Sequence, residues 1–169
     1  YLQRLGWLGS GEPAAVEKAG DGNINWVRRV RAGGRSVVVK QARPQLERFP
    51  EYEAPTERIV CEAQYWEIAR PLDRDGVAPG VVAFDAAARV LLLEDLGDAP
   101  RLDVAMAQGV DASPAAERLA RFLGAVHAAT AGDTMLARRF PNDGMRRLHG
   151  DHIFVLPFHA NEFALDPPV

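Results

Sequence analysis

The fold of this chain is decided by Gly20-Asp21-Gly22-Asn23-Ile24-Asn25-Trp26-Val27, which is followed at 37–40 by Val-Val-Val-Lys. The first run predicts a glycine-rich turn leading into a β-strand, and the second predicts a strand that ends in a lysine. Glycines let the backbone come close to a ligand, and exposed amides there donate hydrogen bonds to phosphate oxygens. A lysine on the neighbouring strand adds a positive charge beneath the same phosphates. Together the two runs predict a nucleotide site.

Composition sets the broad class of the protein. The 169 residues are 47% hydrophobic and 25% charged, as in an ordinary globular domain. A net charge of −3 does not favour nucleic acid or an anionic membrane as a partner. The single cysteine, Cys61, excludes an internal disulfide and fits a reducing compartment. The sequence shows no apolar run long enough to cross a membrane and no signal peptide, so we expect a cytoplasmic protein.

The pattern of the first 97 residues predicts a small sheet with one helix. Strands are expected at 16–18, 24–31 and 36–42, the last two joined by the hairpin turn Ala-Gly-Gly-Arg. A helix at 56–69 carries Ile59, Ala63 and Trp66 on one apolar face and is stopped by a proline. Two more strands are expected at 81–85 and 90–94. The order is therefore three strands, one helix and two strands, which predicts an α+β fold.

The composition turns helical after Gly97, which marks the expected boundary between two lobes, 1–97 and 98–169. Ser113 followed by Pro114 predicts the N-cap and first turn of a helix that runs to about residue 130. We expect one buried stripe on this helix, formed by Leu119, Phe122, Leu123 and Val126. The rest of the chain is mixed, with one strongly apolar run at 153–156.

Glu62 adds a third element to the predicted nucleotide site. It lies three residues after Ile59 and four before Trp66, so it borders the apolar face of the 56–69 helix. A carboxylate is costly to bury without a partner, and Lys40 on the preceding strand is the obvious one. We therefore predict an ion pair that aims Lys40 at the phosphates. Each of these three features also has a purely structural explanation when it is taken alone. The glycine turn can be a plain β-turn, Lys40 an edge lysine that reaches water, and Glu62 a half-exposed side chain at the margin of the apolar face.

A fourth element is Leu-Leu-Leu-Glu-Asp-Leu at 91–96, an apolar strand that ends in the connector between the two lobes. Such a connector offers bare backbone groups to the edge of an adenine. With these four elements in order, the chain resembles the aminoglycoside phosphotransferase and choline kinase superfamily. Within it, Gly-Asp-Gly-Asn at 20–23 and Val-Lys-Gln-Ala at 39–42 are most similar to the 5-methylthioribose kinase family. The resemblance covers about residues 1–130.

This resemblance implies a protein-kinase-like small lobe, a five-stranded antiparallel sheet plus one helix, at 1–97. Residues 98–169 would be the truncated start of a helical large lobe. It also implies ATP and Mg²⁺ as cofactors, and a small metabolite with a sugar-like hydroxyl as the phosphoryl acceptor. The implied contacts are a phosphate loop at 20–25, a phosphate contact by Lys40, its orientation by Glu62, and adenine contacts by the backbone. The cofactor-binding candidates are Gly20, Asp21, Gly22, Asn23, Asn25, Lys40, Glu62, Glu94 and Leu96.

The catalytic half of such an enzyme is not evident in the sequence. Leu-His-Gly-Asp at 148–151 is similar to the family's catalytic loop, which makes Asp151 a candidate base. The asparagine expected about five residues later is replaced by Leu156, and Asp166 stands just before the final Pro-Pro-Val. The segment 140–163 instead resembles the stretch that precedes the catalytic loop. Residues His149, Asp151, His152 and His159 match no standard metal-site spacing.

We therefore expect a piece of a longer kinase that is inactive by itself, with the catalytic base and the Mg²⁺ ligands beyond Val169. One alternative is a stand-alone nucleotide-binding module or pseudokinase that regulates a partner. A second alternative is an assembly domain that self-associates through apolar residues such as Ile153, Phe154, Val155 and Phe158. Four arginines near the glycine turn, Arg28, Arg29, Arg31 and Arg35, are expected to be solvated and receive no role.

Overall fold

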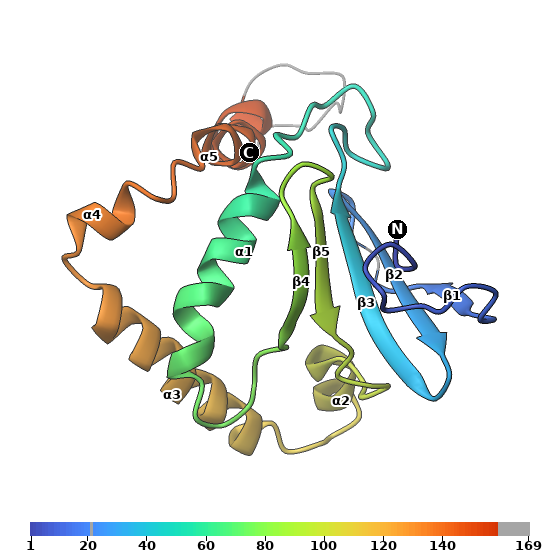
Figure 1. Ribbon diagram of the computed structural model, residues 1–169. Helices are drawn as coiled ribbons and strands as arrows, with labels where there is room; N and C mark the ends of the chain where they lie inside the picture. The colour runs from blue at the N-terminus through green and yellow to red at the C-terminus, as the bar shows by residue number, and fades with distance from the viewer. Residues whose placement is uncertain (21, 159–169) are drawn as a thin grey trace.

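The computed structural model describes residues 1–20 and 22–158 and has an α+β fold (Figure 1). Its sheet is antiparallel, with five strands in the order β1-β2-β3-β5-β4. The strands are β1 (Ala15–Lys18), β2 (Asn25–Ala32), β3 (Arg35–Ala42), β4 (Val81–Asp85) and β5 (Val90–Glu94). All five lie where the sequence pattern predicts them, so the predicted α+β class and the antiparallel sheet are confirmed.

The α-helices are α1 (Arg58–Ala69), α2 (Leu102–Ala107), α3 (Ser113–Thr130), α4 (Thr134–Ala137) and α5 (Asp143–Gly150). Short helical turns follow α1 at Arg70–Leu72 and follow α5 at Asp151–Val155 and Leu156–Phe158. Ser113 does not cap α3 as predicted. The helix starts one residue earlier, with Ala112 as the N-cap, because the Ala116 N–H donates to the Ala112 carbonyl at 2.9 Å, and the Ser113 N–H donates to Asp111 Oδ1 at 2.9 Å.

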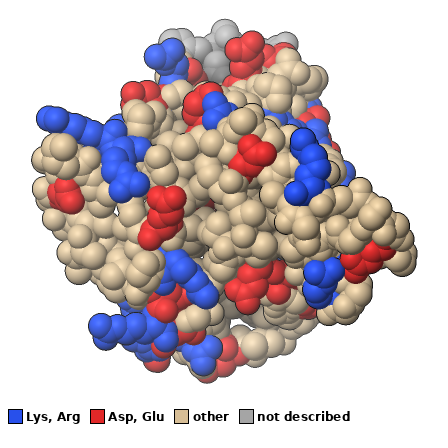
Figure 2. Space-filling view, in the orientation of Figure 1, with Lys and Arg blue, Asp and Glu red and all other residues tan. Residues whose placement is uncertain are grey.

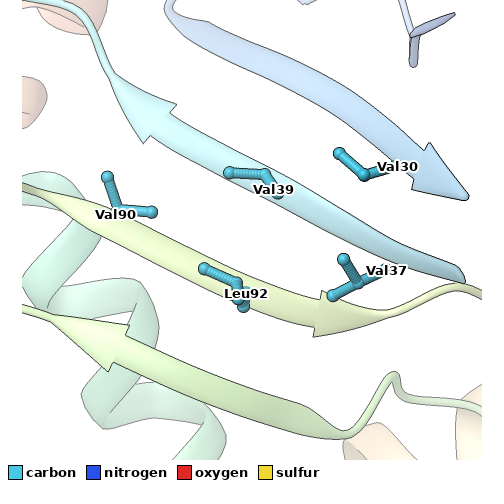
Figure 3. Close-up of a cluster of buried hydrophobic side chains, with 5 residues drawn as sticks. All are labelled: Val30, Val37, Val39, Val90 and Leu92. Carbon is cyan, nitrogen blue, oxygen red and sulfur yellow. The ribbon is translucent and has the colours of Figure 1, made fainter. Parts of the chain in front are cut away.

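One face of the sheet carries the first core cluster (Figure 3). Strands β2, β3 and β5 each contribute side chains of this cluster, which are at most 8% exposed. Aromatic and apolar residues of the N-terminal segment pack over them, including Tyr1, Leu2 and Trp7. The alternation of the strands places these five residues on one face: Val30, Val37, Val39, Val90 and Leu92.

The opposite face of the sheet is covered by α1 (Figure 1). Ile59 and Ala63 of this helix are buried against Ala42, Leu91 and Leu93 of the strands. Trp66 is partly buried at the edge of the same cluster, so the predicted apolar face of the helix is confirmed. Since side chains alternate along a strand, Lys40 points to the side of the sheet that α1 covers, as do Val38 and Ala42 two residues away.

Helix α3 is only half covered. Phe122 and Val126 are buried, and they pack with Ala69 and Ala78 near the C-terminal end of α1. Leu119 and Leu123, by contrast, are 44% and 38% exposed. The prediction of one fully buried stripe is therefore wrong for two of its four members, because α3 meets its neighbours along a single edge.

The surface is mixed in charge. On the face drawn in Figure 2, acidic and basic side chains are interspersed and no large area of one sign forms.

Every helix within the described residues is too short or too polar to cross a bilayer. Toward the end of the described chain, several apolar side chains are exposed, in agreement with the sequence-based expectation: Ile153, Phe154, Val155 and Phe158.

Candidate nucleotide site

The ion pair predicted between Lys40 and Glu62 is present. The Nζ atom of Lys40 on β3 donates to Oε1 of Glu62 on α1 at 2.7 Å. Both side chains are largely covered, at 23% and 26% exposed. Residue 40 lies opposite Val27 and Leu91 in the sheet, so the neighbouring strands fix its position from both sides. The pair therefore ties the middle of the sheet to the helix that covers it.

A cavity of about 270 Å³ adjoins this ion pair. Its walls come from the end of the glycine turn, from β3, from α1 and from α5, which lies beside the start of α1 in Figure 1. Of the predicted site residues, the cavity brings together Asn25, Lys40 and Glu62. The full lining is Ile24, Asn25, Lys40, Arg58, Glu62, Asn142, Met145, Arg146 and His149.

The glycine turn is held by its own hydrogen bonds. Gly20 has a φ of +71°, a conformation that side-chain-bearing residues rarely adopt, which explains the glycine. Asn23 accepts hydrogen bonds from the backbone N–H groups of Arg48, at 2.7 Å, and Glu47, at 2.8 Å. Asn23 thus anchors the turn to the following loop. The structure does not place Gly20, Gly22 or Asn23 on the wall of the cavity, and Asp21 lies outside the described residues.

Arg58 is a site residue that the sequence analysis missed. It is the first residue of α1 and is 7% exposed, and its guanidinium donates to backbone carbonyls on three segments. The acceptors include Ile24 O, Arg43 O at 3.0 Å and Pro55 O at 2.6 Å, together with the Asn25 side chain at 3.1 Å. Burial lowers the pKa of Arg58, and the nearby Glu62 carboxylate opposes that shift. Arg58 therefore fixes the cavity wall at residues 24 and 25.

The connector after β5 is positioned by two sets of contacts. Glu94 exchanges hydrogen bonds with Gly80, since its N–H donates to the Gly80 carbonyl and its Oε2 accepts from the Gly80 N–H, both at 2.8 Å. Leu96 is 59% exposed, and its N–H has no hydrogen-bond partner in the described part of the chain. Neither residue lines the cavity beside Lys40. The Leu96 amide is thus free to meet an incoming ligand.

The expectation that Arg29 is a solvated residue without a role is wrong. Its Nε lies 2.8 Å from Asp95 Oδ2, and its Nη2 donates to the Gly97 carbonyl at 2.6 Å. Asp95 is only 3% exposed, and Arg29 is 18% exposed. Burial alone would raise the pKa of Asp95, but hydrogen bonds from Ser36 and Gly97 and the Arg29 charge outweigh it, so the pKa lies below its usual value. This pair fastens the connector to β2.

The other three arginines of that group lie nearer the surface. Arg28 stacks on the ring of Trp26, with 4.6 Å between the guanidinium carbon and the ring centroid. Arg31 pairs with Glu17 at 2.7 Å and is 42% exposed. Arg35 pairs with Glu12 at 3.2 Å and is 51% exposed.

Asp151 lies apart from Lys40. It lines a separate cavity of about 720 Å³ with residues of the 44–56 loop and of α5, including Glu53 and Arg147. The histidine that follows it, His152, contacts the Leu148 carbonyl through Nδ1 at 2.8 Å and packs edge-on against Tyr52. No group of three or more metal-ligating side chains occurs within residues 1–20 and 22–158. His159 and Asp166 lie outside these ranges.

Comparison with protein-family models and with curated proteins finds no match to this chain. A largely covered ammonium and an amide side chain line one cavity beside a glycine turn, and a buried guanidinium holds the wall of that cavity. Donors of this kind bind phosphate oxygens.

Proposed function

We propose that this chain binds ATP and forms the nucleotide-binding part of an ATP-dependent small-molecule kinase with a protein-kinase-like small lobe. The observation that carries the proposal is the Lys40–Glu62 ion pair, which joins β3 to α1 beside the cavity that Asn25 of the glycine turn also lines. In kinase-type sites a strand lysine is held by a helix glutamate while it contacts the phosphates. The order of glycine turn, lysine strand and glutamate helix supports the same proposal.

The geometry leaves Lys40 donors for a ligand. An ammonium has three donors, and Glu62 accepts one of them at 2.7 Å. The remaining donors are available to phosphate oxygens in the cavity. The adenine would lie toward the connector, where the Leu96 N–H is free and where Arg29 and Asp95 hold the backbone in place.

The residues of this cavity do not fit a Mg²⁺ ion held by the protein. Mg²⁺ prefers carboxylate oxygens and water in octahedral geometry. Among the described residues that line the cavity, Glu62 is the single carboxylate, and it is engaged by Lys40. The acceptor, a small metabolite with a sugar-like hydroxyl, rests on the family resemblance alone.

The lysine content allows a direct test. The sequence has two lysines, Lys18 and Lys40. A lysine-reactive acyl phosphate of ATP should acylate Lys40 rapidly, and excess ATP should block this reaction. Lys18, which is 50% exposed and 3.8 Å from Glu47, serves as the internal control and should react slowly without protection by ATP. Peptide mapping that finds both lysines labelled equally, with no protection, would contradict the proposal.

Calorimetric titration gives a second measurement. ATP should bind weakly to the wild-type chain and to the Lys18→Ala variant, and Lys40→Ala should lower the affinity by about tenfold or more, because charge-assisted hydrogen bonds to phosphate are lost. An unchanged affinity in Lys40→Ala would remove the nucleotide site from this cavity.

A binding module without catalytic activity is the alternative that one observation favours. Asp151, the candidate base, lines a different cavity from Lys40. We expect no ATP turnover by the 169-residue chain. Turnover that disappears in Asp151→Asn would assign Asp151 as the base and overturn this expectation.

A further inference from the structure

Helix α5 and the residue before it supply one wall of the Lys40 cavity. Asn142, Met145, Arg146 and His149 from this part of the chain line it, facing Lys40, Arg58 and Glu62. The sequence analysis gave Arg146 no role. The helix therefore adds basic side chains to a cavity that already holds the proposed phosphate-binding lysine.

The charges of this cavity do not balance. Three of its lining residues are cationic, Lys40, Arg58 and Arg146, whereas Glu62 is the single carboxylate in the described lining. Lys40 is paired with Glu62, and the Arg58 guanidinium is surrounded by carbonyl acceptors. Arg146 is exposed, and its side chain has no hydrogen bond or ion pair with any residue that the structure describes. A positive charge thus remains beside the cavity without a partner among the described residues.

The position of Arg146 is fixed by its neighbours on α5 and by a histidine in the helical turn that follows α5. Met145 is 5% exposed, so the adjacent position is held in the interior. Gly144 lies so close to Pro55 that an added Cβ would stand 2.4 Å from the proline Cγ. The ring of His152 packs against Tyr52 with 4.6 Å between centroids. These contacts seat α5 on the loop before α1 and hold Arg146 beside the cavity.

We propose that Arg146 binds the polyphosphate chain of the nucleotide as a second cation opposite Lys40. This inference rests on the proposed ATP binding. A cavity of about 270 Å³ is small for a whole nucleotide but suits a short chain of phosphates. A guanidinium presents paired N–H donors that match phosphate oxygens, and the charge left free at this position is of the right sign. His149, three residues further on the same helix, lines the same wall.

The test compares Arg146→Ala with Arg147→Ala. Arg147 is also exposed and belongs to the same helix, but it lines the separate cavity that contains Asp151. The probes are ATP, inorganic tripolyphosphate and adenosine, titrated calorimetrically at low salt, with circular dichroism of each variant as the folding control. Arg146→Ala should weaken ATP and tripolyphosphate about tenfold, the effect of losing a charged hydrogen bond, and should leave adenosine unchanged. Arg147→Ala should change all three by less than about twofold.

Each outcome decides between the two proposals. Equal affinities of Arg146→Ala and Arg147→Ala for tripolyphosphate overturn the role of Arg146 and leave ATP binding standing. If tripolyphosphate binding depends on Arg146 but ATP binds no more tightly than tripolyphosphate, the nucleotide proposal is overturned and the cavity is an anion site. No binding of either phosphate compound by the wild-type chain overturns both.

Discussion

The sheet with α1 and the helices after Gly97 differ in how far their apolar side chains are buried. Leu91 and Leu92 in β5 are fully covered, whereas Leu119 and Leu123 in α3 are exposed by 44% and 38%, although all four belong to regular apolar patterns. The N-terminal segment packs on one face of the sheet and α1 packs on the other, whereas α3 meets its neighbours along one edge only. A periodic pattern therefore identifies an apolar face, but the neighbouring elements decide whether that face is buried.

The same contrast applies to the two arginines of the cavity. Arg58, in the well-packed half, is 7% exposed and donates to carbonyls on several segments. Arg146, on α5, is exposed and unpaired within the described residues. A buried guanidinium that donates to several backbone carbonyls stabilises the fold, whereas an unpaired guanidinium beside a cavity is suited to bind a ligand. The contrast therefore assigns Arg58 a structural role and leaves Arg146 as the arginine suited to bind a ligand.

The largest difference between the two regions should appear on truncation of a leucine. Leu92→Ala removes a fully buried side chain from the cluster in Figure 3 and should lower the free energy of unfolding by about 3–4 kcal/mol. Leu119→Ala, in the exposed part of α3, should cost less than about 1 kcal/mol. Urea unfolding followed by circular dichroism measures both. Equal losses would show that α3 is covered in solution.

The second prediction concerns Arg58. Arg58→Met keeps much of the side-chain volume but leaves the carbonyls of residues 43 and 55 without a donor, while the Ile24 carbonyl keeps the Arg43 N–H at 3.2 Å. We expect a loss of about 2–3 kcal/mol in the free energy of unfolding, because buried acceptors would lose their partner. Arg147→Met on exposed α5 is the control and should be close to neutral. A neutral Arg58→Met would mean that water replaces the guanidinium at no cost.

The third prediction tests the connector. Asp95→Asn removes the charge that pairs with Arg29 and should lower the free energy of unfolding by about 1–2 kcal/mol at neutral pH. Because the pKa of Asp95 is lower in the folded protein than in the unfolded chain, its contribution is present above about pH 4 and is lost as the pH falls through the folded value. The difference between wild type and Asp95→Asn should therefore shrink in acid. A difference independent of pH would exclude the carboxylate as its source.

The sequence predicted the sheet and α1 well because alternation in strands and helical periodicity are local properties. The Lys40–Glu62 pair was also predictable, since a carboxylate beside an apolar stripe needs a cation and β3 offers one. Arg29 was missed because its partner Asp95 follows far along the chain and becomes a neighbour only when β2 and the connector fold together. The position of Arg146 beside the cavity was missed because α5 carries few apolar residues that would predict its packing. The position of α5 depends on a close contact between Gly144 and Pro55.

The smallest effect is expected for the ion pair between Arg121 on α3 and Asp75 in the loop after α1, at 2.9 Å. The hydrogen bond from Arg121 and its charge hold the pKa of Asp75 below its usual value, but Arg121 is 57% exposed and salt screens such pairs. Arg121→Ala should therefore leave the unfolding midpoint almost unchanged. The small remaining shift of the midpoint should shrink further in high salt. Phe122→Ala is the matched comparison, because its buried side chain makes the adjoining contact with Ala69 and Ala78. If thermal unfolding showed the larger loss for Arg121→Ala, α3 would be held by charge rather than by its narrow apolar edge.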